Sequence, residues 1–262
     1  SPVGIVISGL AEKAQIPHVN DFASDPHVAD GQFNFLHYTP AYKDVELFVQ
    51  QLHKRNIKNI VVFAQQDNPG ALALSNALES AADSAGIQIV AIQKYVGDTR
   101  DFKTLIGQTK NLNVEAYVLE GTSPSIEIIT KQIREAGIKT PITSMEAFEF
   151  SDQLSLFEGM WYVNAADPTK EFMESFKSAY GSYPKFGSAN GYDAVNLIVE
   201  AVESIGDGKT IPTNIQIRDA IAGTKNFKSA LGGELSLDAE GMVLSEPVVR
   251  MIKDGKPVTI SK

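Results

Sequence analysis

Two hydroxyl side chains and one acid follow two apolar runs that the sequence predicts to be neighbouring strands. Thr122 and Ser123 come after residues 116–120, and Glu146 comes after residues 142–145. The segment between these runs has helical spacing, so the stretch predicts one βαβ unit with parallel strands. In open parallel sheets, ligands bind outside the carboxyl ends of the strands. We therefore expect a ligand-binding edge here, with hydroxyl groups and a carboxylate as its polar groups.

The helix of this unit is predicted from its own start and stop signals. Ser123 is expected as the N-cap and Pro124 as the first helical residue, a favoured pairing. Three isoleucines at helical spacing give the segment one apolar face, and Gly137 is expected to end it.

The elements on either side predict an α/β chain. Residues 59–148 alternate apolar strands with amphipathic helices, which is typical of a doubly wound parallel sheet. After Phe148 we expect a strand at 159–164 and three helices, at about 168–180, 188–205 and 213–223. Antiparallel strands are then expected at 234–238, 243–252 and 258–260, with a tight turn at Asp254-Gly255. A regular block between two stretches that break its pattern predicts two lobes with several chain crossings.

Composition excludes several function classes. The chain has 262 residues, of which 43% are hydrophobic, so it can build a core of one large or two ordinary domains. Its formal net charge of −9 disfavours nucleic acid as a partner. With no cysteine, thiol catalysis, cysteine-bound metals and disulfides are excluded. No apolar run is long enough to span a bilayer, and no signal peptide is present, as expected of a secreted protein after processing.

Motifs for catalysis and metal binding do not occur. Residues 206–210, GDGKT, resemble a phosphate loop, but Glu203 stands where the pattern requires glycine, and a helix precedes the segment. Neither GxGxxG nor GxSxG occurs, and the four histidines lack metal-binding spacing. We therefore expect no catalytic residue, no metal and no cofactor.

Four stretches carry a family resemblance. They are residues 24–26 (SDP), 130–137 (TKQIREAG), 158–163 (EGMWYV) and 189–195 (ANGYDAV). In this order the chain resembles type I periplasmic binding proteins, most closely the branched-chain amino-acid (Leu/Ile/Val) receptors of ABC transporters. The resemblance runs through the whole chain, but the family's opening βα units are absent from it.

The resemblance implies a fold and a set of partners. Two α/β lobes with parallel doubly wound sheets would be joined by three crossing strands and close on a small ligand by hinge motion. The first lobe would comprise residues 1–38 and 165–243, incomplete at its N-terminus, and the second residues 39–164 and 244–262. The implied partners are a small ligand, either an amino acid or a small carboxylate, and a membrane permease. The implied location is periplasmic or otherwise extracytoplasmic.

The resemblance also implies roles for single residues. In family members that bind amino acids, one lobe holds the α-carboxylate with a serine at a helix N-terminus and an Ala-Thr pair. Ser1 matches that serine, and Ala23-Ser24 match the pair. The other lobe holds the α-ammonium with an acid, and Glu146 falls at that position, where it would form a charge-assisted pair. The alternative for Glu146 is a solvated loop carboxylate.

Two positions depart from the family pattern. Pro69 stands where the family often has a tyrosine before a glycine, and Thr122 stands where it has a second one. Phe22 and Phe148 could supply an apolar wall instead, although ordinary core packing is the alternative for both. Asn68 is a further ligand candidate, but turn residues at that place need no function.

We therefore expect the solute-binding receptor of an ABC importer, which captures a small amino-acid-like or carboxylated ligand in the cleft between the lobes. One alternative is a ligand-sensing regulatory module of the same fold. The other is a small-molecule enzyme on a doubly wound sheet, because a fold does not fix a function. The absent catalytic motifs argue against the enzyme.

Overall fold

The computed structural model describes residues 2–206, 208, 210–243 and 245–261. Ser1, expected at the ligand site, and residues 207 and 209 of the GDGKT segment lie outside the described residues. The chain forms two compact units. The first consists of residues 1–40 and 166–246, and the second of residues 41–165 and 247–262. The chain passes from one unit to the other three times, after Pro40, Ala165 and Glu246.

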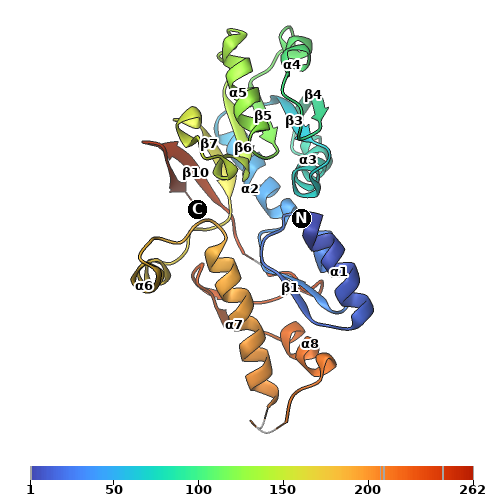
Figure 1. The fold of residues 1–262 in the computed structure, drawn as a ribbon. Helices are drawn as coiled ribbons and strands as arrows, with labels where there is room; N and C mark the ends of the chain where they lie inside the picture. The colour runs from blue at the N-terminus through green and yellow to red at the C-terminus, as the bar shows by residue number, and fades with distance from the viewer. Residues whose placement is uncertain (1, 207, 209, 244, 262) are drawn as a thin grey trace. The chain divides into compact units, whose positions relative to one another are not determined.

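The second unit is built on a seven-stranded sheet in the order β11-β10-β7-β6-β5-β3-β4 (Figure 1). Five of these strands are parallel, namely β3 (Asn59–Gln65), β4 (Gln88–Tyr95), β5 (Ala116–Glu120), β6 (Ile142–Met145) and β7 (Trp161–Asn164). The predicted α/β class with a parallel doubly wound sheet is confirmed for this part. Antiparallel pairing adds β10 (Val248–Lys253) and β11 (Lys256–Ser261) at one edge. Asp254 and Gly255 form their turn with φ of 53° and 67°, which suits a two-residue hairpin.

Helices cover both faces of this sheet. They are α2 (Ala41–Lys54), α3 (Pro69–Ala82), α4 (Lys103–Thr109) and α5 (Ser125–Glu135). Ile60 and Val62 of β3 pack into one apolar cluster with α2 and α3, whereas Val61 and Phe63 pack into another with α4 and α5. Successive side chains of a strand point to opposite faces, so β3 is buried on both sides, as expected of a central parallel strand.

The predicted start of α5 is wrong. The helix begins at Ser125, with Pro124 at the N-cap, and no side chain caps it. Ser123 Oγ instead donates a hydrogen bond of 2.7 Å to Glu127 Oε1. The sequence predicts that the Ser123 hydroxyl caps the helix by bonding to its backbone amides. It bonds instead to Glu127 in the first turn, so the serine does not act as the cap.

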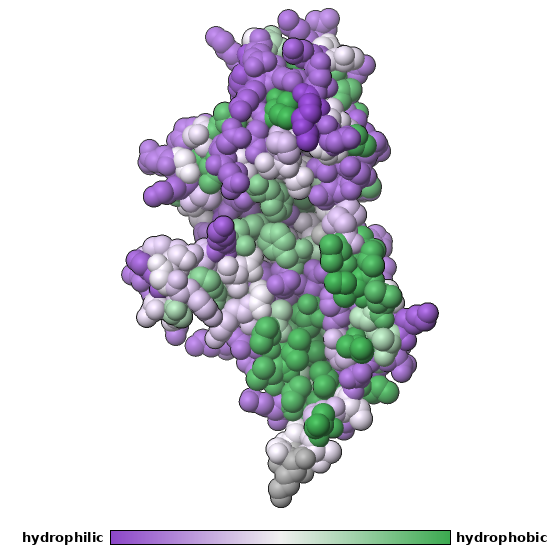
Figure 2. Space-filling model, in the orientation of Figure 1, coloured by the Kyte–Doolittle hydropathy of each residue, from purple (hydrophilic) through white to green (hydrophobic). Residues whose placement is uncertain are grey.

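The first unit is mainly helical. Its helices are α1 (Pro2–Ala14), α6 (Lys170–Tyr180), α7 (Ser188–Ile205) and α8 (Asn214–Ala222). Its described strands form two short pairs, parallel β1 (His18–Asn20) with β2 (Asn34–Leu36) and antiparallel β8 (Phe227–Lys228) with β9 (Glu234–Leu235). Apolar side chains of α1 and α7 remain exposed, among them Val3, Val6 and Val195, and Figure 2 shows green surface along both helices.

Two strands predicted near the C-terminus are shorter than expected. The strand expected at 234–238 ends at Leu235, and that expected at 243–252 begins only at Val248. Asp238 Oδ1 accepts bonds from the backbone N–H groups of Glu240 and Met242, so this aspartate closes a turn instead of continuing a strand. Within the described residues, no helix has the length and apolar character needed to cross a bilayer.

Candidate ligand-binding site

Three carboxyl groups come together inside the second unit. Asp44 lies in the first turn of α2, Glu120 is the last residue of β5, and Glu146 follows β6 directly. Because β5 and β6 are adjacent and parallel, their carboxyl ends lie at one edge of the sheet, where ligands bind in such folds. The exposed fractions of the three residues are 0%, 1% and 2%, so Glu146 is not the solvated loop carboxylate of the alternative interpretation.

The fold holds these acids in place. The backbone N–H of Met145 donates a 2.9 Å bond to Glu120 Oε1, and the carboxyl group of Asp44 adjoins that of Glu146. Glu146 has φ of 66° and ψ of −38°, a conformation that non-glycine residues rarely adopt. Such backbone costs about 1–3 kcal/mol and is concentrated at functional sites. The position of the Glu146 carboxyl is therefore set by the backbone as well as by its neighbours.

The environment makes part of this cluster hard to ionise. Burial raises the pKa of Asp44 well above its usual value, and the neighbouring carboxyl groups of Glu146 and Glu120 raise it further. Burial also raises the pKa of Glu120, against the opposing effect of the Met145 amide. Neighbouring carboxyl groups in a low-dielectric site disfavour one another's charged form, so ionising all of them costs free energy. The cluster can therefore hold protons, or bind a cation in their place.

We expect Asp44→Asn to change the pH dependence of stability. The pKa of Asp44 is higher in the folded protein than in the unfolded chain. Its contribution to the free energy of unfolding is therefore complete below the unfolded-state pKa and is lost as pH rises through the folded-state pKa. Asparagine does not ionise and escapes this loss. Thermal unfolding should show the variant about 1–3 kcal/mol more stable than the parent in alkaline buffer and equal to it near pH 4. The exposed Asp83→Asn is the control, and a difference that is constant with pH would contradict the prediction.

The turn residues of the second unit have local roles. Thr122 donates from its backbone N and from Oγ1 to Gln65 Oε1, both at 3.0 Å, and so ties the end of β5 to β3. Asn68 Oδ1 accepts a 3.1 Å bond from the N–H of Ala71 and caps α3, of which Pro69 is the first residue. These contacts explain the residues as turn and cap residues, and their contact with a ligand stays a prediction.

Phe148 lies in the core of the second unit. Its ring stacks on Phe157 with a centroid distance of 4.4 Å and meets Tyr162 edge-on at 5.4 Å. The side chain is fully buried among the apolar residues on the α4 and α5 side of the sheet. The structure therefore places Phe148 in the core packing that the sequence left open as the alternative to ligand contact.

In the first unit, the residues after β1 form a partly open aromatic corner. Ala23 and Ser24 are buried, whereas Phe22 keeps 37% of its surface exposed. The ring of Phe22 meets those of Tyr38 and Phe186 edge-on, each at 5.1 Å between centroids. Sequence reasoning missed Tyr38 and Phe186, although each is an aromatic residue next to an element boundary. This corner offers an apolar wall beside the Ala23-Ser24 backbone.

Gly187 allows this close approach. Its φ is 84°, and a Cβ at this position would lie 2.9 Å from two carbons of the Phe22 ring. Only glycine combines that conformation with so little space. The loop before α7 can therefore bring Phe186 against Phe22.

A buried polar network lies in the same unit. His37 Nε2 is 3.0 Å from Asp193 Oδ2, and Ser229 Oγ and the backbone N of Ala230 also donate to that carboxylate. Asn190 Nδ2 donates a 3.1 Å bond to the carbonyl of His37. Asn190 and Asp193 come from the 189–195 stretch that carries the family resemblance. Their role in this structure is to hold the segment before Pro40 and the 229–230 loop on α7.

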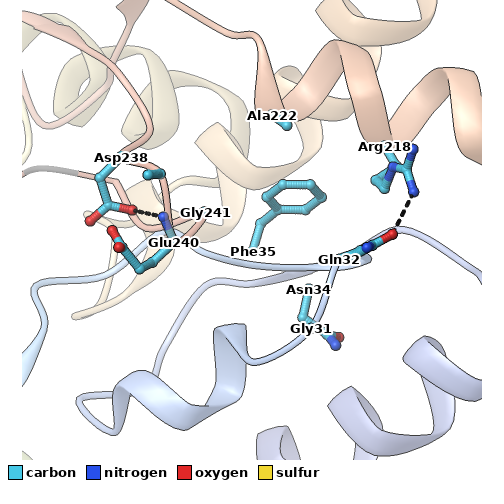
Figure 3. Close-up of a pocket in the computed structure, with 10 residues that line it drawn as sticks. Gly31, Gln32, Asn34, Phe35, Arg218, Ala222, Asp238, Glu240 and Gly241 are labelled. Atoms are coloured by element: carbon cyan, nitrogen blue, oxygen red, sulfur yellow. Dashed lines mark hydrogen bonds between the residues drawn. The ribbon is translucent and has the colours of Figure 1, made fainter.

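A separate hollow of 410 Å³ in the first unit lies between β2, α8 and the 238–241 turn (Figure 3). Arg218 Nη1 donates a 3.1 Å bond to Gln32 Oε1, and its other nitrogens bind Asp219. On the opposite wall, Asp238 Oδ1 accepts from the backbone N of Glu240. The Arg218–Gln32 bond thus joins two walls of the hollow, whereas the Asp238 bond stays within one turn. Among the described residues, no three histidine or acidic side chains are arranged to hold a metal.

Known proteins resemble this chain over nearly its whole length. The family model described as periplasmic binding protein matches residues 1–253. Leu/Ile/Val-binding protein homolog 7 of Brucella abortus is 20% identical and covers 98% of this chain and 71% of its own length. A leucine-binding protein of Thermotoga maritima is 24% identical, with a TM-score of 0.87 over 98% of this chain and 76% of its own. A solute-binding protein of R. palustris in complex with benzoate is 16% identical, with a TM-score of 0.84 over 99% and 74%.

Proposed function

The chain belongs to the periplasmic binding protein family, whose model matches residues 1–253, and from this premise we propose that it is the solute-binding receptor of an ABC importer. We propose an amino-acid-like ligand that carries a carboxylate and an ammonium group. The observation that carries this choice is the buried Glu146 carboxyl at the carboxyl edge of the parallel sheet. Family and structural relatives are named as binding proteins, which supports binding without conversion of the ligand.

The ligands named for the relatives support the proposal that the ligand carries a carboxylate group. One structural neighbour is a leucine-binding protein and another holds benzoate, and both of these small molecules carry a carboxylate group. In the first unit, the Ala23-Ser24 segment beside Phe22 is the candidate for this group, with hydroxyl and backbone donors next to an apolar wall.

The acid cluster of the second unit supports the proposal that the ligand carries an ammonium group. A cation beside Glu146 would form a charge-assisted hydrogen bond and relieve the mutual repulsion of the buried acids. Benzoate has no group that could do this, so we favour an amino acid over a simple carboxylate. We also propose that the loaded protein delivers its ligand to a membrane permease outside the cytoplasm, in keeping with its family.

Titration calorimetry against the amino acids, benzoate and small aliphatic carboxylates tests this function. We expect one or a few zwitterionic amino acids to bind, and their analogues without the ammonium group to bind more weakly. Binding of the amino acid should strengthen as pH rises through the raised pKa values of Asp44 and Glu120, because the cation replaces bound protons. If the folded protein bound no member of the panel, the proposed function would be wrong.

A further inference from the structure

Helices α6 and α7 of the first unit border a second hollow, of 580 Å³, with an aromatic wall. The four rings that line it are Phe172, Phe176, Tyr180 and Tyr192. Neighbouring rings lie 5.8 Å (Phe172–Phe176), 5.2 Å (Phe172–Tyr192) and 4.6 Å (Phe176–Tyr180) apart between centroids. These distances are those of interacting aromatic pairs, so the rings form one continuous band across two helices.

Core packing accounts for only the middle of this band. Phe172, which lies between Phe176 and Tyr192, is buried against Ala189 and Ala230 in a small apolar cluster. The two ends of the band, Tyr180 and Tyr192, expose 72% and 55% of their surface. A contiguous aromatic surface that stays exposed at its ends is typical of a ligand-binding groove.

The charges that border the hollow are mainly negative. Glu171 of α6 and Glu200 of α7 line it together with one cation, Lys228. Within the described part of the chain, neither glutamate forms an ion pair. Carboxylates and the faces of aromatic rings both attract cations. A cation already lies against an aromatic ring near the end of α6, where Lys177 Nζ is 4.3 Å from the centroid of the Tyr183 ring.

The floor of the hollow is fixed. Ser229 and Ala230 line it, and both donate hydrogen bonds to the buried Asp193 carboxylate, one residue after Tyr192. Because these residues are already held in place, binding a ligand does not require the free energy of ordering them.

We propose that this hollow is a second binding site, for a small organic cation of the methylated-ammonium class. Such a cation places its methyl groups on the rings and its charge towards Glu171 and Glu200, and so uses both features of the wall. A hard inorganic cation requires several oxygen ligands, and the aromatic band offers few. This site lies in the first unit and involves none of the residues assigned to the amino-acid ligand.

Choline chloride is the probe, and 3,3-dimethyl-1-butanol, its neutral isostere, is the matched ligand control. We expect choline at millimolar concentrations to shift the NMR signals of residues around Tyr180 and Tyr192, and the neutral isostere to bind at least several-fold more weakly. The double variant Tyr180→Leu with Tyr192→Leu should weaken choline binding by about 5–30-fold, the product of two exposed cation–π contacts. Tyr183→Leu, which replaces an exposed tyrosine that does not line the hollow, should leave it unchanged.

Two results would overturn this inference. One is equal binding of choline and its neutral isostere, or no binding of choline at all. The other is unchanged binding in the double variant when its thermal unfolding matches that of the parent. Choline binding should also persist in Glu146→Gln and in the presence of saturating amino acid. Loss of one activity with retention of the other therefore separates a failure of this site from a failure of the proposed receptor function.

Discussion

Glu146→Gln is expected to weaken the binding of a zwitterionic amino acid by about 2–5 kcal/mol, which is roughly 30-fold or more in the dissociation constant. Glutamine keeps the size of the side chain and one acceptor oxygen, but it removes the charge. Only 2% of the Glu146 residue is exposed, so solvent and salt screen its attraction for an ammonium group only weakly. Titration calorimetry of the parent and the variant against the same amino acid measures the loss.

A ligand that lacks the ammonium group is the control for this prediction. The analogous carboxylate should bind the parent and Glu146→Gln with similar affinity, because this ligand has no ammonium group to pair with the side chain at position 146. Glu135→Gln, an exposed exchange at the end of α5, controls for the loss of one negative charge from the unit. If the zwitterion bound equally well to the parent and to Glu146→Gln, the assignment of Glu146 to the ammonium group would be wrong.

Asp193→Ala is expected to destabilise the first unit by about 3–5 kcal/mol. The Asp193 carboxylate accepts bonds from Ser229 Oγ and the backbone N of Ala230 and faces His37 Nε2 at 3.0 Å. All of these groups are buried, and alanine would leave them without their acceptor. Each buried polar group left without a partner costs about 1–3 kcal/mol. This loss of stability should appear as a lower midpoint of thermal unfolding.

Hydrogen exchange shows where the effect of Asp193→Ala is located. Amides of α7 and of the 229–230 loop should lose protection, while those of β3 and β5 in the second unit should keep it. Asp193→Asn retains one acceptor oxygen and should cost less than alanine. Equal unfolding midpoints for the parent and Asp193→Ala, or a loss of protection confined to the second unit, would show that this network does not hold the first unit together.

Local spacing was enough to predict most of the elements. The predicted strand at 116–120 and helix at 188–205 have the bounds found in β5 and α7. Ile126, Ile129 and Ile133, placed on one helical face by their spacing, are all fully buried. These predictions succeeded because helical and strand periods are properties of neighbouring residues.

Competition between nearby polar groups limited the prediction of boundaries. Ser123 has the chemistry of an N-cap, yet its hydroxyl binds the carboxylate of Glu127. Asp238 continues an apparent strand pattern, yet its carboxylate closes a turn. In both cases one side chain had two possible local partners, and residue type does not decide between them.

The sequence by itself determined a parallel α/β sheet and the strand end at which Glu146 stands, because apolar periodicity and turn residues act over a few positions. Only the tertiary structure decided that Asp44 and Glu120 share the buried surroundings of Glu146, and that Phe186 meets Phe22. It also joined His37 to Asp193, which are 156 positions apart. Such contacts depend on how whole strands and helices pack, and the spacing of residues along the chain does not carry that information.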